Sequence, residues 1–202
     1  MDDTFQESSG KELTRQLDGC IAGIAQGDRD ALAELYRQTS TSVYAFALSI
    51  LKNVHDAEDV LQESYLRIYD AAWSYRSHGK PMAWIMTIVR NLCMMRLREK
   101  SRTAELTEED WNDALSESCE MNIDDRIILS QCLSQLGEDE RQIVILHAVT
   151  GFKHREIAAF LDMPLATVLS KYSRSLKKLK NYLERRAWHD EPGNRKETEA
   201  GI

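Results

Sequence analysis

Apolar residues recur at steps of three and four along most of this chain, which is the period of an amphipathic helix. The pattern predicts helices over residues 12–26, 31–51, 56–75, 81–100, 125–136, 139–149, 155–161 and 165–183. No segment shows the alternation of apolar and polar residues that is typical of a half-buried β-strand. We therefore expect an all-α protein.

Acidic residues indicate where two of these helices begin. Asp28 or Asp30 could cap the helix over 31–51, because a short polar side chain accepts hydrogen bonds from the first backbone N–H groups. Asp56 and Asp59 form a plausible capping pair for the next helix.

Charge divides the chain into segments. Residues 101–125 carry nine acidic residues and one basic residue without an apolar period, which is typical of a flexible linker. Residues 126–186 carry eleven basic and six acidic residues, although the whole chain has a net charge of −7. We expect an N-terminal tail with a short helix (1–27), a helical domain (28–100), a flexible acidic linker (101–125), a second helical domain (126–186) and a disordered tail (187–202).

The second domain contains the pattern of a helix-turn-helix. A short helix ends at Asp162-Met163-Pro164, and Pro164 suits the start of the helix that follows. Between Lys171 and Arg186 seven residues are basic and only Glu184 is acidic. A polar, basic face of this kind fits a helix that lies in the DNA major groove. The plainer interpretation is a solvated face of an amphipathic helix.

Carboxylates cluster at the start of the helix over 56–75. The cluster is Asp56, Glu58, Asp59 and Glu63. Asp59 and Glu63 lie opposite the apolar stripe, and no neighbouring lysine pairs with them. The cluster could be a capped, solvated helix start or a docking face for a basic partner. A di-metal helix bundle would require a Glu-x-x-His pair, which this helix lacks.

Aromatic residues flank a polar loop after this helix. Trp73, Tyr75 and Trp84 bracket the loop over 77–80, and basic residues follow. Aromatic side chains beside basic ones suit unstacked bases, because every base offers a π-face. The alternative is that the two tryptophans belong to the core.

Several function classes have no support in the sequence. No nucleophile elbow, phosphate loop or metal motif is present, so we expect neither an enzyme nor a cofactor. The four cysteines lie far apart and are expected to be reduced, although Cys119 could sense redox state. An acidic N-terminus and the lack of an 18-residue apolar segment indicate a cytoplasmic protein.

Three of these blocks together resemble the extracytoplasmic-function group of bacterial RNA polymerase sigma factors. They are Asp56-Ala57-Glu58-Asp59-Val60-Leu61-Gln62-Glu63, Trp84-Ile85 with Arg90-Asn91, and Glu156-Ile157-Ala158 with Pro164-Leu165-Ala166-Thr167-Val168-Leu169-Ser170. The resemblance covers residues 28–100 and 126–184, and it is specific because the three blocks occur in the family's order.

The resemblance implies a subunit that binds core RNA polymerase and promoter DNA and is held by an anti-sigma factor. It assigns core binding to Asp56, Glu58, Asp59, Gln62 and Glu63. It assigns the minus-ten element, including a flipped base, to Trp73, Tyr75, Ser77, His78, Lys80, Trp84, Arg90, Asn91, Arg96 and Arg98. It assigns the minus-thirty-five element to Arg155, Thr167, Ser170, Lys171, Arg174, Lys177 and Lys178.

The chain departs from the family pattern at three positions. Leu169 and Leu176 replace common basic residues, and Gly137 replaces a common proline. These departures predict that Lys171 and Arg174 carry more of the minus-thirty-five contact. A free-standing helix-turn-helix regulator remains the alternative function, although it leaves the carboxylate and tryptophan blocks unexplained. A purely structural helical adaptor, whose basic domains would not touch nucleic acid, is a third.

Overall fold

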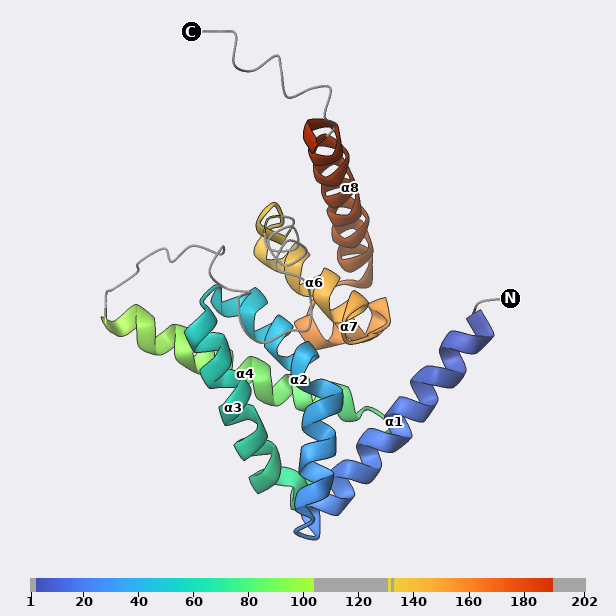
Figure 1. Cartoon of the computed structure of the whole chain (residues 1–202), viewed down its shortest axis with the longest axis vertical. Helices are drawn as coiled ribbons and strands as arrows, with labels where there is room; N and C mark the ends of the chain where they lie inside the picture. Colours follow the sequence, from blue (N-terminus) through green and yellow to red (C-terminus); the bar gives the residue numbers. More distant parts are fainter. Residues whose placement is uncertain (1–2, 104–130, 132, 191–202) are drawn as a thin grey trace, which may run out of the picture.

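The computed structural model describes residues 3–103, 131 and 133–190, and all of the regular structure in these residues is helical (Figure 1). The elements are α1 (Asp3–Ala25), α2 (Arg29–Leu51), α3 (Val54–Ala71), the 3₁₀ turn η1 (Ala72–Ser74), α4 (Pro81–Thr103), α6 (Glu138–Ala148), α7 (His154–Leu161) and α8 (Leu165–Asp190). The predicted all-α class is confirmed. Most of the predicted linker and the tail from residue 191 lie outside the described residues.

Helix caps explain two of the boundaries. Asp28, rather than Asp30, caps α2, and its carboxylate accepts hydrogen bonds from the backbone N–H groups of Asp30 and Ala31. Asn53 caps α3 by accepting from the N–H of Asp56. The prediction that Asp56 and Asp59 cap this helix is therefore wrong, because the helix begins two residues earlier, at Val54.

Helix ends differ from the prediction elsewhere too. The first helix starts at Asp3 rather than near residue 12, and α4 continues to Thr103, into the predicted linker. The last helix, α8, runs to Asp190, past the start of the predicted tail at residue 187.

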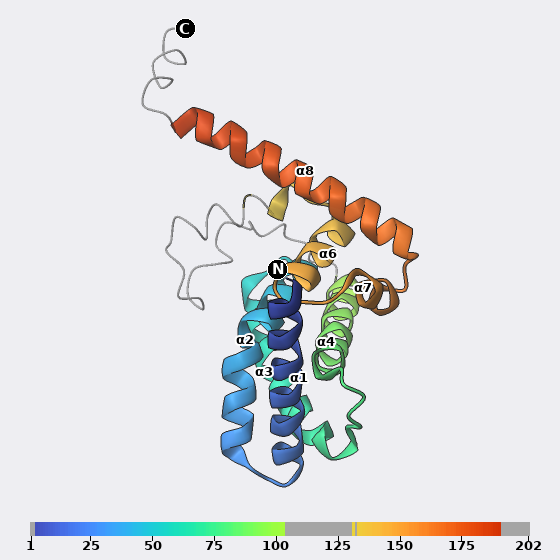
Figure 2. The same ribbon diagram turned by 90° about the vertical axis from the view of Figure 1, so that its right-hand side faces the viewer.

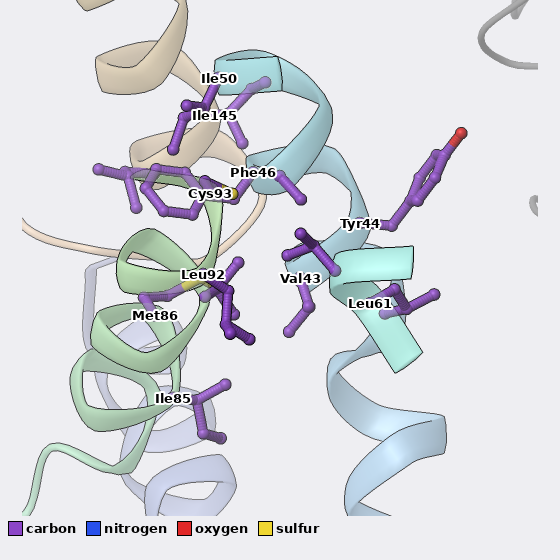
Figure 3. Close-up of a cluster of buried hydrophobic side chains, with 14 of the residues drawn as sticks. Val43, Tyr44, Phe46, Ile50, Leu61, Ile85, Met86, Leu92, Cys93 and Ile145 are labelled. Carbon is purple, nitrogen blue, oxygen red and sulfur yellow. The ribbon is translucent and has the colours of Figure 1, made fainter. Parts of the chain in front are cut away.

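Helices α1 to α4 form a bundle that we call the N-terminal unit. The second half of α2, residues 43–51, is almost wholly buried because α3, α4 and α6 all pack against it. Figure 3 shows Phe46 and Ile50 of α2 meeting Cys93 of α4 and Ile145 of α6 in one cluster. Burial of this many apolar side chains is the main force that holds the bundle together.

A glycine allows α1 and α2 to approach closely at their hairpin. A Cβ atom on Gly23 would lie 2.9 Å from the Cβ of Ala31, a distance that side-chain carbons do not tolerate. Leu17 and Ile21 of α1 are buried against the bundle on the turns before this point. The long N-terminal helix is therefore firmly seated along its second half.

Helices α6, α7 and α8 form the C-terminal unit, which contains the predicted helix-turn-helix. Asp162 adopts the left-handed conformation, with a φ of +55°, and ends α7. The N–H of Met163 donates to the carbonyl of Ala158, and Pro164 then leads into α8. The predicted turn between the two helices is confirmed.

The two units are in contact. Figures 1 and 2 show α6 and α7 at one end of the α1–α4 bundle, with α8 on their far side. The hydroxyl of Ser42 donates to the carbonyl of Val149, and the guanidinium of Arg141 donates to the carbonyl of Ser49. Helix α6 therefore packs against α2 on one side and α8 on the other. Among the described residues, no helix is long and apolar enough to cross a membrane.

Candidate docking and nucleic-acid surfaces

One outward side of α3 combines acidic and apolar residues, and we call it the α3 face. Its members recur at steps of three and four and are Asp59, Gln62, Glu63, Leu66, Tyr69, Asp70 and Trp73. Leu66 is 68% exposed and Trp73 is 74% exposed. A core position for Trp73 is therefore excluded, and its ring continues the face into η1.

Sequence analysis did not select Leu66 or Tyr69 as site residues. Their spacing from Asp59 and Glu63 was available in the sequence, since residues three and four apart share a side of a helix. Exposure was the missing information, because apolar side chains are assigned to the core by default. In the structure both are exposed beside the carboxylates.

The carboxylates of α3 are paired rather than free. Arg96 of α4 lies 3.2 Å from the Asp59 carboxylate, and Arg67 lies 3.3 Å from that of Glu63. Asp56 pairs with Lys100 at 2.5 Å and is only 14% exposed. The sequence analysis considered only neighbouring lysines, whereas arginines pair with Asp59 and Glu63 in the structure.

These ion pairs separate the predicted core-binding residues into a structural group and an outward-facing group. Asp56 ties the start of α3 to the end of α4, whereas Asp59, Gln62 and Glu63 remain on the outward side. Glu58 lies near His55 at 3.9 Å, within the same helical turn. The α3 face is accordingly a mildly acidic surface around an apolar strip.

The loop over 75–80 is anchored at its start. The ring of Tyr75 packs against Trp84 with centroids 4.8 Å apart. The Tyr75 hydroxyl donates to Asp18 of α1 at 2.6 Å, and the Ser77 hydroxyl donates to the same carboxylate at 2.8 Å. Burial, together with the bond to Asp18, raises the pKa of the Tyr75 hydroxyl above its ordinary value.

The structure brings three predicted residues, Tyr75, Ser77 and Trp84, into one group. His78 and Lys80 lie on the exposed remainder of the loop, where Gly79 has a φ of +68°. Sequence analysis missed Asp18, whose contacts span 57 and 59 residues of sequence and leave no local signal.

Two of the predicted minus-ten cations contact α7. The Arg90 guanidinium donates to the carbonyl of Phe160 at 3.3 Å and lies 5.7 Å from the centre of the Phe160 ring. The Lys80 ammonium lies 3.8 Å from the Glu156 carboxylate. DNA that takes these donor groups would compete with α7 for them. Asn91 and Arg98 are exposed on α4.

The predicted DNA-binding cations of α8 fall into two groups. Lys171 lies 2.6 Å from Asp139 and is 25% exposed, and Lys178 lies 2.6 Å from Glu140. These two lysines hold α8 against α6. Arg174, Lys177 and Ser170 are exposed on the outward side, with Thr167 half-buried on the preceding turn and Arg155 exposed on α7.

The geometry favours Arg174 and Lys177 over Lys171 for contact with a ligand. The guanidinium of Arg174 donates only to the carbonyl of Ser170 in its own helix, at 3.3 Å, among the contacts described for this side chain. Leu169 and Leu176, the two departures from the family pattern, are exposed on the same helix.

The described residues contain no cluster of three or more His, Cys, Asp and Glu side chains placed to hold a metal ion. Cys20 and Cys93 are free thiols, and burial raises the pKa of Cys93 to about 12, which makes it unreactive. Cys119 lies outside the described residues.

Comparison with protein families matches both units. The model described as Sigma-70 region 2 matches residues 35–103, and the model described as Sigma-70, region 4 matches residues 126–179. The ECF RNA polymerase sigma factor SigK of Mycobacterium ulcerans (strain Agy99) is 28% identical over 176 residues, which cover 83% of this chain and 94% of that protein. The ECF sigma factor SigE of Mycolicibacterium smegmatis is 30% identical over 188 residues, which cover 89% of this chain and 73% of SigE.

Two solved structures share the fold. CnrH, in complex with the cytosolic domain of CnrY, has a TM-score of 0.57 and 20% identity, over 84% of this chain and 98% of CnrH. The sigma factor RpoE of Bartonella quintana, in complex with the anti-sigma factor NepR, has a TM-score of 0.62 and 23% identity, over 75% of this chain and 96% of RpoE.

Proposed function

This chain belongs to the extracytoplasmic-function group of RNA polymerase sigma factors, and from that premise we propose which of its surfaces serves each step of initiation. It is a non-enzymatic subunit that directs RNA polymerase to promoters. We assign residues 28–100 to core binding and the minus-ten element, and residues 126–186 to the minus-thirty-five element. The chain acts in the cytoplasm, where RNA polymerase is found.

The α3 face is the surface that docks on core polymerase. The exposure of Leu66 and Tyr69 beside Asp59 and Glu63 is the observation that carries this assignment. Apolar side chains exposed together at one place favour a protein partner, and a few such residues supply most of the binding energy of an interface. The carboxylates add attraction to a basic rim and help to orient the partner.

The loop over 75–80 receives an unpaired base of the minus-ten element. The stacked Tyr75 and Trp84 supply aromatic surface, and Ser77, His78 and Lys80 supply polar groups around it. Extruding a base from the duplex costs a few kcal/mol, which stacking and hydrogen bonds at such a site offset. Arg90, Asn91, Arg96 and Arg98 line the path of the melted strand. Trp73, at the η1 end of the α3 face, serves this strand rather than core polymerase.

The outward side of α8 meets the minus-thirty-five element in the major groove. We assign Arg174 and Ser170 to base edges, and Lys177 and Arg155 to phosphates, because all four side chains are exposed. Base contacts specify the sequence, whereas phosphate contacts fix the register of the helix on the duplex. Lys171 and Lys178 contribute mainly by fixing α8 to α6.

Regulation is proposed to follow the two structural neighbours. CnrH was solved with the cytosolic domain of CnrY, and RpoE with the anti-sigma factor NepR. We assign this chain a regulator of the same kind, an anti-sigma factor that releases it on a signal.

Substitution on the α3 face tests the core-binding assignment. Leu66→Ala combined with Tyr69→Ala should weaken binding to core polymerase about a hundredfold, or ~3 kcal/mol, because both anchors are lost. Thermal unfolding should change little, since both side chains are exposed. Charge reversal at Asp59 would be less clean, because it also breaks the pair with Arg96.

The matched control is Leu13→Ala with Tyr36→Ala. These residues have the same chemistry and are 42% and 44% exposed, but they lie on α1 and α2. The control variant should bind core polymerase as the parent does. Equal binding of both double variants, measured by fluorescence titration with labelled core enzyme, would exclude the α3 face as the docking surface.

A further inference from the structure

Asp18 joins the N-terminal helix to the loop over 75–80. Its two carboxylate oxygens accept separate hydrogen bonds, one from the Tyr75 hydroxyl at 2.6 Å and one from the Ser77 hydroxyl at 2.8 Å. We propose that Asp18 is a positioning residue for minus-ten recognition, because it holds this loop in the form that accepts a base. The inference rests on the proposed function of the loop.

The carboxylate is held by a rigid element. Leu17, its neighbour on α1, is fully buried, and Ile21 one turn later is 1% exposed. The close approach at Gly23 fixes α1 against α2. A group held in this way transmits its position to whatever it binds, as supporting residues do for a preorganised site.

The loop depends on Asp18 for much of its anchoring. Beyond Ser77 the side chains through Lys80 are exposed, and Gly79 has the left-handed φ that permits a tight bend. At the far end the Lys80 ammonium pairs with Glu156 of the other unit, and the Lys80 carbonyl accepts from the N–H of Trp84 in α4. When Lys80 leaves Glu156, Asp18 still ties the first half of the loop to α1 through two side-chain hydrogen bonds.

Preordering the loop favours binding of a base. A loop that is already in its bound form does not lose conformational freedom when the ligand arrives, so less of the interaction energy is used to order it. The hydrogen bond to Asp18 also fixes the edge of the Tyr75 ring that packs on Trp84. Loss of the carboxylate should reduce base preference rather than folding.

The region 2 match does not account for this residue. It begins at residue 35, so α1 and Asp18 lie before the matched segment. The assignment comes from the two hydrogen bonds and from the seating of α1.

The experiment uses holoenzyme and a fork-junction DNA that is single-stranded over the minus-ten element of a promoter it transcribes. A second DNA set carries an abasic site at each position of that element in turn. The affinity for intact DNA is divided by the affinity for each abasic DNA. The position at which this ratio is largest for the parent is then used for all variants. Asp18→Ala should lower this ratio three- to tenfold, and Asp18→Asn, which keeps one acceptor oxygen, should lower it less.

A double-mutant cycle tests whether Asp18 acts through the loop. In a Tyr75→Phe/Ser77→Ala background both hydroxyl donors are absent, so Asp18→Ala should cause no further loss. Glu12→Ala is the matched control, because it removes the same charge from an exposed position on α1. Its ratio should equal that of the parent.

Three outcomes would overturn the proposal. If Asp18→Ala weakens intact and abasic DNA equally, the residue has only a structural role. If Asp18→Ala keeps the ratio while Tyr75→Phe/Ser77→Ala loses it, the loop functions without Asp18, and the proposed function stands. If Tyr75→Phe/Ser77→Ala also keeps the ratio, the hydrogen bonds to Asp18 do not position the base, and the inference fails. Tyr75→Ala with Trp84→Ala then tests the loop itself, because it removes the aromatic surface. A ratio kept there too would show that the loop receives no base, and the assignment of the loop would fail as well.

Discussion

The two units bury different kinds of polar side chain. In the described N-terminal unit these are the hydroxyls of Thr39, Ser49 and Ser64. Each donates to a carbonyl three or four residues earlier in its own helix. In the described C-terminal unit they include the charged residues Glu140 and Arg141, whose partners come from other segments.

The difference follows from the position of α6. The beginning of this helix lies between α2 and α8, so its residues 140–146 are buried whichever way they point. A hydroxyl can be satisfied by its own helix, but a buried charge requires partners supplied by the tertiary structure. The N-terminal unit should therefore tolerate changes in pH and in polar groups better than the C-terminal unit.

Removing the buried guanidinium should have the largest effect. Arg141 donates to the carbonyls of Leu133, Leu136 and Ser49, all within 3.2 Å. Arg141→Met keeps an unbranched side chain but leaves these acceptors without that donor, so we expect a loss of about 3 kcal/mol in the free energy of unfolding. Urea denaturation followed by circular dichroism measures it.

The control for this variant is Ser49→Ala in the N-terminal unit. It removes a buried hydroxyl that donates to Phe46 in the same helix, and it should cost about 1 kcal/mol or less. If Arg141→Met and Ser49→Ala lower the free energy of unfolding equally, the two units do not differ in how much they depend on buried polar groups.

A smaller effect is expected at Glu140. Burial alone would raise the pKa of this carboxyl, but hydrogen bonds from Lys178 and from the Gly137 N–H outweigh it, and the pKa lies below its usual 4.5. Glu140→Gln should therefore cost about 1–2 kcal/mol at neutral pH, the range for hydrogen bonds to charged groups. Asp139→Asn, in the more exposed pair with Lys171, should cost about 0.5 kcal/mol.

The stability that the Glu140 carboxylate contributes should decrease as the pH falls. A carboxyl whose pKa is lower in the folded state stabilises the fold fully above pH 4.5, and this contribution disappears as the pH falls through the lowered value. The parent and Glu140→Gln should therefore converge in stability in acid. Parallel stability curves from pH 7 to pH 3 would contradict the assignment.

The smallest effect is expected from the paired histidine rings. His154 packs against His147 and Tyr172, with ring centroids 4.4 and 4.7 Å apart. Burial, and the charge that His147 can carry, lower the pKa of His154 from 6.5. The unfolded chain therefore takes up the proton first, so the free energy of unfolding should fall as the pH drops below 6.5.

His154→Phe keeps an aromatic ring but cannot titrate. Its free energy of unfolding should be flatter between pH 7.5 and pH 5.5 than that of the parent. If the free energy of unfolding of His154→Phe changes with pH as steeply as that of the parent, another group causes the pH dependence. His55→Phe is a suitable control, because the His55 side chain is 88% exposed in the N-terminal unit. The control should keep the pH dependence of the parent.

The sequence predicted the parts of the fold that depend on local patterns. The helical period and the turn at Asp162-Met163-Pro164 arise within a few residues, as does the cap of α2, which the sequence narrowed to Asp28 or Asp30 and the structure assigns to Asp28. The start of α3 was missed because Asn53 competes with Asp56 for the same capping role, and both residue types are good caps.

The candidate sites were predicted less completely because their contacts are distant in sequence. Asp59 meets Arg96 only after α3 and α4 pack side by side, and Asp18 meets Tyr75 only after α1 folds back onto the bundle. Helical periodicity shows which residues share a side of one helix but not what lies opposite. For the same reason it could not separate Lys171, which faces Asp139, from Arg174.

Under the proposed role of Arg90 in minus-ten binding, its contact with Phe160 makes the C-terminal unit a competitor for that DNA. A nucleotide that engages the Nη1 group of Arg90 has to displace the Phe160 carbonyl, which accepts from this group at 3.3 Å. Because both units belong to one chain, α7 competes at a constant effective concentration, however dilute the protein is. The apparent affinity of a ligand that binds Arg90 then equals its intrinsic affinity multiplied by the fraction of molecules in which the contact with Phe160 is open.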